Sequence, residues 1–190
     1  PEPGPGQALI EVSAVGVNFI DIYNRMGWYK LPQMPSGLGG EGAGRVIAVG
    51  PDVAEVRVGD RVAWLGGANT YATHVVIPAT KLAPIPDAVS DEQAAAAMVQ
   101  GITAHVLTTR TYPVKTGDRM LVHAAAGGAG RLLCQMGRRL GAQVIGTVSS
   151  EAKARIAREA GAGHTINYTE QDFLAEVRRI TDGQGVNVVY

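Results

Sequence analysis

The hydrophobic pattern changes character about half-way along the chain. In the first hundred residues, short runs of alternating or β-branched apolar residues are separated by glycine and proline, which is typical of short strands. The segment VRVGDRVAW also predicts a hairpin with Gly59 and Asp60 at its turn. Residues 1–100 are therefore expected to form a β-rich domain. The four runs predict strands at residues 8–17, 45–49, 61–65 and 71–77.

A long segment without a strand pattern separates the first two predicted strands. Residues 19–26 have the spacing of about two helical turns, which Gly27 ends. The aromatic pair Trp28 and Tyr29 follows, and then two prolines. Because long loops in compact domains often carry function, this segment is a candidate for part of a binding site.

The second half of the chain begins with a helix signal. Ser90 followed by Gln93 is a capping box, and the alanine-rich run behind it has high helix propensity. The helix is expected to run to about Tyr112, because Pro113 cannot continue it. A break at Gly101 is the alternative to one continuous helix.

Strands and helices then alternate, which predicts parallel βαβ units joined by right-handed crossovers. Residues 101–190 are therefore expected to form a doubly wound α/β domain. A dinucleotide-binding sheet of the usual order 3-2-1-4-5-6 has six strands, whereas the pattern predicts only four in this part of the chain. We therefore expect this chain to be part of a longer protein. The predicted strands are 119–123, 143–148, 164–167 and 186–190, and the predicted helices are 128–140, 151–160 and 170–181.

A glycine-rich corner joins the first of these strands to its helix. Gly127, Gly128 and Gly130 stand there, and Ala125 occupies the first position of an otherwise matching GxGxxG pattern. Such a corner aims backbone N–H groups and the positive end of a helix at one point, which suits a pyrophosphate. The alternative is a tight strand-to-helix corner without a ligand. The surrounding βαβ array favours dinucleotide binding.

The end of the next strand indicates which dinucleotide would bind. NAD-specific sites usually place Asp or Glu there for the ribose 2′-hydroxyl, whereas this chain has the residues TVSS at 147–150. Ser149, Ser150 and Lys153 suit a 2′-phosphate, which favours NADPH, although Glu151 weakens the positive field. The alternative makes Ser150 a helix N-cap and Lys153 a solvated surface residue.

Composition narrows the classes of function. The chain has 17 basic and 17 acidic residues, so no excess charge favours nucleic acid or an anionic membrane. The single cysteine, Cys134, falls among the apolar positions of a helix and is expected to be a packed thiol in a reducing compartment. We found no apolar run of about 20 residues and no leader pattern, so a cytoplasmic protein is expected. The four histidines, at 74, 105, 123 and 164, are scattered and predict no metal site.

Several motifs together resemble one family. AAAGGAGRLLCQ resembles the nucleotide signature of quinone oxidoreductases in the zinc-independent branch of the medium-chain dehydrogenases. VGVNFIDIYNRMGWY and PSGLGGEGAGRV resemble their substrate-side loop, and VGDRV, GITAH and NYTEQDF fit the same pattern. The resemblance covers the chain in order. It implies a GroES-like catalytic domain followed by a Rossmann domain, with the active site in the cleft between them and a homodimer for the full-length protein.

The resemblance also implies roles for individual residues. Asn18, Tyr23 and Tyr29 are expected to position substrate and deliver a proton, and Thr103 to contact the nicotinamide. A packed loop anchor is the alternative for Tyr29. The remaining implied cofactor contacts are Phe19, Ile20, Asp21 and Ile22 on the nicotinamide side, Ala126, Gly127, Gly128, Ala129 and Gly130 at the pyrophosphate, and Ser149, Lys153 and Tyr168 at the 2′-phosphate and its ribose.

Two positions of the predicted cofactor site stay open. Tyr168 could instead cover an edge of the sheet. Arg131 departs from the family's usual apolar residue after the last glycine, and it could either add charge near the phosphates or only lie on the helix surface. Zinc-dependent relatives carry a cysteine where Val17 and Asn18 stand, a histidine where Gly40 stands and a lobe of four cysteines. Without zinc, an easily reduced acceptor is the expected substrate.

The function expected from the sequence is hydride transfer from NADPH to a quinone. Two alternatives stay open. One is an NADPH-dependent reductase of 2-alkenals or enones with the same fold, since pocket shape alone separates the two. The other is a nucleotide-binding relative without turnover.

Overall fold

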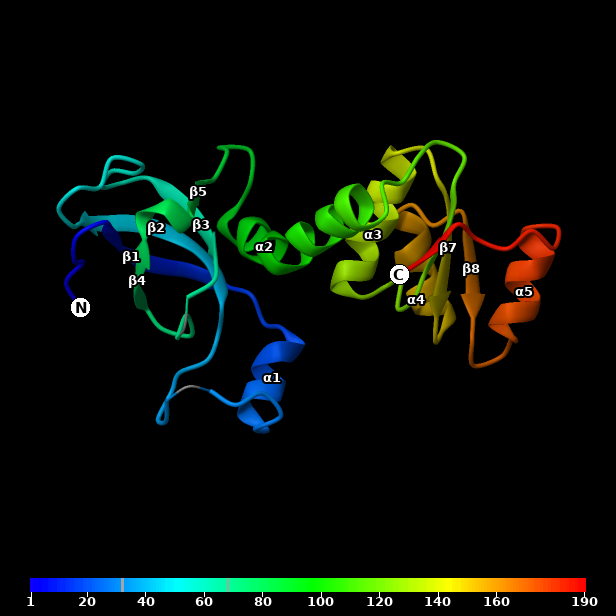
Figure 1. Cartoon of the computed structure of the whole chain (residues 1–190), viewed down its shortest axis with the longest axis horizontal. Coiled ribbons are helices and arrows are strands. Elements are labelled where there is room, and N and C mark those ends of the chain that lie inside the picture. Colours follow the sequence, from blue (N-terminus) through cyan, green and yellow to red (C-terminus); the bar gives the residue numbers. More distant parts are fainter. Residues whose placement is uncertain (32, 68) are drawn as a thin grey trace. The chain divides into compact units, whose positions relative to one another are not determined.

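The chain folds into two compact units. The computed structural model describes residues 1–31, 33–67 and 69–190, which divide into Pro1–Val99 and Gln100–Tyr190. The sheet of the first unit is antiparallel and that of the second is parallel (Figure 1). Within the described ranges, no helix has the length and apolar character that a membrane span requires.

The first unit is built on a five-stranded sheet of order β4-β1-β2-β3-β5. The side chains of Ile10, Val46, Trp64 and Ile77 are fully buried between its strands and form its core. A short helix, α1 (Phe19–Arg25), follows β1 as the spacing predicts (Figure 1). The strands are β1 (Gln7–Val15), β2 (Glu41–Val49), β3 (Arg61–Leu65), β4 (His74–Pro78) and β5 (Leu82–Pro84), with a 3-10 turn at Ala79–Lys81.

The pattern predicted that this strand begins at residue 45, but β2 begins four residues earlier, at Glu41. The glycines in its first half interrupt the alternation of apolar and polar residues from which a strand is predicted. The structure requires glycine at these positions, because a side chain would not fit. A Cβ at Gly42 would overlap the ring of Trp64 on β3, and a Cβ at Gly44 would overlap the backbone of β1. The added strand length places Glu41 beside the end of β1, since Gly42 is paired with Val15.

The predicted hairpin in VRVGDRVAW is wrong, although its turn exists. Gly59 has φ +96°, and Asp60 N donates to Arg57 O at 3.1 Å. The residues before the turn form no strand, because the turn binds β2 instead. Gly59 N donates to Val46 O at 2.8 Å, and Val46 N donates to Asp60 O at 2.9 Å. β3 therefore pairs with β2 and β5.

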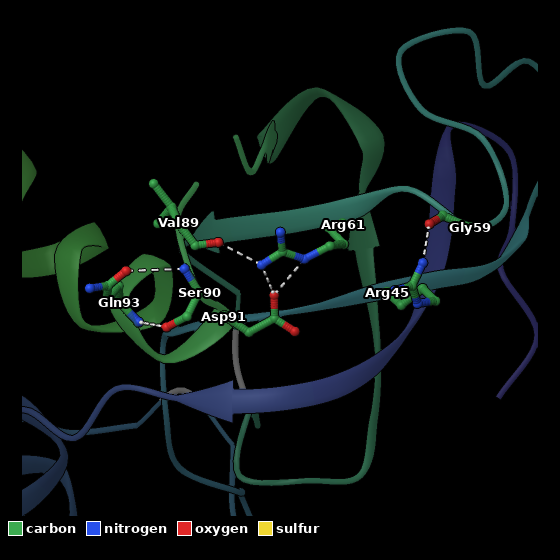
Figure 2. Close-up of polar contacts among 7 residues, drawn as sticks. All are labelled: Arg45, Gly59, Arg61, Val89, Ser90, Asp91 and Gln93. Carbon is green, nitrogen blue, oxygen red and sulfur yellow. Dashed lines mark hydrogen bonds and ion pairs between the residues drawn. The ribbon is translucent and has the colours of Figure 1, made fainter. Parts of the chain in front are cut away.

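The helix predicted from Ser90 is confirmed. α2 (Asp91–Val106) passes Gly101 without a break and continues as a π turn over Leu107–Thr111. The capping box closes in both directions, with Gln93 N donating to Ser90 Oγ at 3.2 Å and Ser90 N donating to Gln93 Oε1 at 3.1 Å (Figure 2).

Arg61 of β3 ties the start of this helix to the sheet. Its guanidinium donates to Asp91 Oδ1 at 2.6 and 3.0 Å and to Val89 O at 2.7 Å (Figure 2). Burial tends to raise the pKa of the Asp91 carboxyl, but the hydrogen bonds and charge of Arg61 outweigh it and hold that pKa below its usual value.

The second unit is a parallel sheet of order β8-β7-β6-β9, the first four strands of a doubly wound fold. Alternate residues of β6 enter opposite cores: Met120 and Val122 pack with α3 and α4, and Leu121 packs with α5. Cys134 is fully buried, as predicted, and burial raises its pKa to about 11. The elements are β6 (Arg119–Val122), α3 (Gly128–Arg139), β7 (Gln143–Val148), α4 (Glu151–Glu159), β8 (His164–Asn167), α5 (Phe173–Ile180) and β9 (Val188–Val189).

Candidate functional site

The glycine-rich corner between β6 and α3 is built around a strained alanine. Ala124 has φ +48°, and its carbonyl accepts a hydrogen bond from Gly127 N at 2.8 Å. The left-handed residue is therefore Ala124, one position before Ala125 in the motif's first place. Gly127 is the N-cap of α3 and has no side chain to satisfy the first N–H groups of the helix. The corner thus offers those donors to a ligand.

Gly130 lets the helix approach the strand. A Cβ there would overlap the carbonyl oxygen of Ala124 and lie 2.9 Å from the Cα of Ala125. Gly146 of β7 makes room in the same way, because a Cβ there would lie 2.7 Å from that of Ala125. The third glycine of the motif therefore performs the packing role that the pattern predicts.

A pocket of about 170 Å³ opens at this corner, at the carboxyl ends of β6 and β7. That edge is where doubly wound sheets bind ligands. Five of the residues expected to bind cofactor line it together: Ala126, Gly127, Ser149, Lys153 and Tyr168. Ala124, Thr147 and Val148 complete the lining. Among the residues that the structure describes, no carboxylate lines this pocket.

Lys153 and Ser149 are joined at the rim of the pocket. Lys153 Nζ donates to Ser149 Oγ at 2.9 Å, so both groups face one point. Ser150 is the N-cap of α4 and accepts from Lys153 N at 3.4 Å, as the alternative interpretation of Ser150 held. Glu151 pairs with Arg158. Its charge is therefore engaged by another cation than Lys153.

A second hollow, of about 470 Å³, adjoins the first and shares Ala124, Thr147 and Tyr168 with it. His123 Nδ1 lies 3.0 Å from Thr147 Oγ1, and its ring meets that of Phe173 edge-on at 5.6 Å between centroids. His123, Thr147 and Phe173 were not among the site residues predicted from the sequence. Their position directly after β6, at the end of β7 and at the start of α5 is the signal that would have found them.

The other predicted residues lie elsewhere. Thr103 is exposed on α2, and Gly128, Ala129 and Gly130 form the first turn of α3 beside the pocket. Asn18 directly precedes α1 in the first unit, and Phe19, Ile20 and Ile22 on that helix are 72%, 49% and 37% exposed. Apolar side chains this exposed are available to a ligand or to another part of the protein.

Asp21 turns inward instead. Its side chain is buried and accepts three hydrogen bonds, from Asn18 N at 2.9 Å, Gly39 N at 3.2 Å and Tyr71 Oη at 2.8 Å. Burial, the bond to Asp21 and the negative charges of Asp21 and Glu41 raise the pKa of Tyr71 to about 12. The carboxylate of Asp21 thus holds α1 against the loops around it.

An aromatic cluster continues from α1 into the following loop. Tyr23 stacks on Trp28 with centroids 5.3 Å apart and meets Tyr29 edge-on at 5.6 Å. Tyr29 is both packed and 55% exposed. The packing agrees with a loop anchor, and the exposure leaves its hydroxyl open to a substrate. A hollow of about 380 Å³ beside it is lined by Asn24, Arg25, Met26, Gly27, Tyr29, Lys30, Leu31 and Met34.

The sequence features of both units match known families. Residues 4–87 match the alcohol dehydrogenase GroES-like domain, and residues 128–190 match the domain described as zinc-binding dehydrogenase. The quinone oxidoreductase of Pseudomonas aeruginosa is 47% identical over 190 residues, which cover 100% of this chain and 58% of that protein. Both halves of this chain are thus similar to quinone oxidoreductases of the medium-chain dehydrogenase type. It spans less than two thirds of the length of such relatives.

Two further relatives bear on the chemistry. The crystal structure of Escherichia coli quinone oxidoreductase complexed with NADPH superimposes with a TM-score of 0.96 at 43% identity, over 100% of this chain and 59% of that one. A 2-haloacrylate reductase from Burkholderia is 45% identical over 99% of this chain and 58% of that protein. The family therefore includes reductases with different acceptors.

The described residues of this chain do not fit a zinc ion. Val17, Asn18 and Gly40, which the resemblance sets against the zinc ligands of zinc-dependent relatives, offer no thiolate, imidazole or carboxylate. In the described part of the chain, no three His, Cys, Asp or Glu side chains are grouped closely enough to hold a metal ion.

Proposed function

We propose that the intact protein is an NADPH-dependent quinone oxidoreductase. The observation that carries this proposal is the hydrogen-bonded pair Lys153 and Ser149 at the rim of the glycine-corner pocket, at the strand end where a ribose is read. A cation and a hydroxyl suit a 2′-phosphate, and the family supports a quinone acceptor. When bound, NADPH supplies a hydride from its nicotinamide ring.

The second unit would hold the adenosine half of the cofactor. The N–H groups at the start of α3, over residues 126–130, would receive the pyrophosphate. Lys153 and Ser149 would bind the 2′-phosphate, and Tyr168, which is 52% exposed, would cover the ribose. Thr103 would contact the nicotinamide.

The first unit would orient the reacting groups. Residues 19–22 would line the nicotinamide side through exposed apolar side chains and backbone, since the carboxylate of Asp21 is engaged elsewhere. Asn18 would bind a polar group, and Tyr23 and Tyr29 would contact the quinone, with a tyrosine hydroxyl delivering a proton. Orientation of this kind is the main contribution of a protein to a cofactor-driven reaction.

A second candidate function is supported by one specific relative. The 2-haloacrylate reductase at 45% identity reduces a conjugated acceptor by its name, so an NADPH-dependent enal or enone reductase is the runner-up. A nucleotide-binding protein without turnover is the third candidate. Rates with a simple benzoquinone and with a 2-alkenal separate all three, since the third reduces neither.

The test begins with the intact protein, whose mass is measured against the 19.8 kDa of this chain. NADPH and NADH are then titrated by fluorescence, and quinone reduction is followed by NADPH absorbance. Tight NADPH binding with faster benzoquinone than alkenal turnover supports the proposal. Equal affinity for both dinucleotides would remove the NADP assignment. The homodimer implied by the family is tested in the same preparation by sedimentation.

A further inference from the structure

Glu41 is a buried carboxylate to which no role was assigned from the sequence. It is the first residue of β2, and none of its surface is exposed. In the described part of the chain, Glu41 forms no ion pair with a lysine, arginine or histidine. A buried carboxylate is costly unless its oxygens are hydrogen-bonded, so its partners explain why it is tolerated.

Both oxygens of Glu41 receive a hydrogen bond. Asn18 Nδ2 donates to Oε1 at 2.6 Å, and Val99 N donates to Oε2 at 2.5 Å. The chain makes room for this arrangement at Gly16, where a Cβ would overlap the carboxylate. The pairing of Val15 with Gly42 brings the end of β1 and Glu41 together. The carboxylate is therefore a built feature of the first unit.

The chemistry of this contact fixes the orientation of the Asn18 amide. An ionised carboxylate only accepts hydrogen bonds, so the amide atom facing Glu41 has to be the nitrogen. The carbonyl oxygen of Asn18 then lies on the other side of the amide group, where the capping box of α1 directs one lone pair toward the backbone N–H of Asp21 and leaves the second for another donor. Without Glu41, nothing in this contact would distinguish the two orientations.

We propose that Glu41 is a positioning residue that makes Asn18 present a hydrogen-bond acceptor to the reaction site. This inference rests on the proposed function, in which Asn18 contacts cofactor or substrate. The group it accepts from is a hydroxyl or amide donor, carried either by the nicotinamide half of the dinucleotide or by the hydroxyl product of quinone reduction. A change in the KM for NADPH indicates the first source, and a change in kcat alone indicates the second.

The decisive variant is Glu41→Gln in the intact protein. A glutamine at this position can keep its oxygen on Val99 N, which leaves its NH2 facing Asn18. The Asn18 amide then turns over, and its NH2 replaces the acceptor at the site. We expect kcat/KM for quinone reduction to fall about tenfold or more. Glu11→Gln, an exposed carboxylate on β1, is the matched control and is expected to change neither parameter.

Two double variants separate positioning from a general structural role. In an Asn18→Ala background, Glu41→Gln is expected to have no further effect on kcat/KM, because Glu41 acts through Asn18. Combining Glu41→Gln with Asn18→Asp restores an acceptor, since the new aspartate can take the NH2 of the new glutamine on one carboxylate oxygen and expose the other. Recovery of at least part of the lost activity is expected.

A readout independent of turnover completes the test. In protein labelled with 15N-asparagine, the side-chain NH2 resonance of Asn18 is identified by its loss in Asn18→Ala and is expected to shift in Glu41→Gln. An unchanged resonance, or an equal loss of kcat/KM in both backgrounds, overturns the proposal. If the wild-type protein reduces no quinone, the proposed function fails, and the resonance shift still decides the orientation of the amide.

Discussion

The two parts of the candidate site are constructed in opposite ways. In the second unit, the pocket is formed by backbone at the start of α3 and by side chains within a few residues of each other, such as Ser149 and Lys153. In the first unit, Asn18 and Asp21 are held by Glu41 and Tyr71, which lie 23 and 50 positions away along the chain. The pocket therefore offers free donors, whereas the Asn18 network has used most of its hydrogen bonds internally.

The contrast indicates what each part contributes. Open donors and an exposed cation suit a ligand that brings negative charge, because the ligand completes the hydrogen bonds. A network that is satisfied before the ligand arrives fixes the geometry of a few groups at low cost on binding. The first arrangement is suited to cofactor affinity, and the second to positioning a substrate.

The largest effect is expected where the pocket depends on close packing. Gly130→Ala adds a Cβ against the carbonyl of Ala124 and should reduce the free energy of unfolding by about 3 kcal/mol and abolish NADPH binding. Urea denaturation and NADPH fluorescence measure the two effects. Gly163→Ala is the control, because a Cβ there would meet only Val144 O at 3.7 Å. Normal NADPH binding by Gly130→Ala would show that the close approach is not required.

The next effect tests whether the pocket reads the 2′-phosphate. Lys153→Ala should weaken NADPH binding by about 1.5 to 3 kcal/mol, the range for a hydrogen bond to a charged group, and leave NADH binding nearly unchanged. Fluorescence titration with both dinucleotides measures this. Lys115→Ala in the same unit, outside the pocket lining, should change neither affinity. Equal losses for NADPH and NADH would contradict the NADP assignment.

The same contrast explains how much the sequence could predict. The helix caps at Ser90 and Ser150 were accessible because their partners lie three residues away. The bonds of Glu41 to Asn18 and of Tyr71 to Asp21 join residues 23 and 50 positions apart. Those contacts depend on the register of β1 and β2, which includes two irregularities that no hydrophobic alternation reveals.

The order of strands and helices in the second unit was predicted well for a related reason. Parallel strands with intervening helices give the order β8-β7-β6-β9 and bring the ends of β6 and β7 together whatever the details of side chains. Ala124 and His123 were missed because the motif directs attention to its glycines. The strained residue is instead the one that turns the chain out of β6.

A smaller effect is expected from the aromatic cluster of the first unit. Tyr23→Phe retains the stacking on Trp28 but removes the hydroxyl. It should lower kcat for benzoquinone roughly fivefold, the equivalent of about 1 kcal/mol, and leave NADPH affinity intact. Steady-state kinetics and NADPH titration measure both. Tyr29→Phe is the comparison variant, and an unchanged rate in Tyr23→Phe with a reduced rate in Tyr29→Phe would transfer the role to Tyr29.

The smallest effect concerns the hydrogen bond between Tyr71 and Asp21, and it is measured as a pH dependence of the free energy of unfolding. The pKa of Tyr71 is about 12 in the folded protein, above the ordinary value of 10.0, so folding favours the protonated phenol that donates to Asp21. Its contribution to stability is complete below pH 10 and is lost as the pH rises toward 12. Tyr71 is 40% exposed, so we expect less than about 1 kcal/mol.

Tyr71→Phe should remove that alkaline loss. Wild-type protein is expected to lose stability relative to Tyr71→Phe between pH 10 and 12 in urea denaturation, and at pH 7 the order is reversed because only the wild type keeps the bond to Asp21. Parallel pH profiles of the two proteins would show that the bond to Asp21 stabilises nothing. In that case the hydrogen bonds around α1 would not make the first unit more rigid than the pocket of the second unit. Diverging pH profiles would instead identify these hydrogen bonds as a source of rigidity.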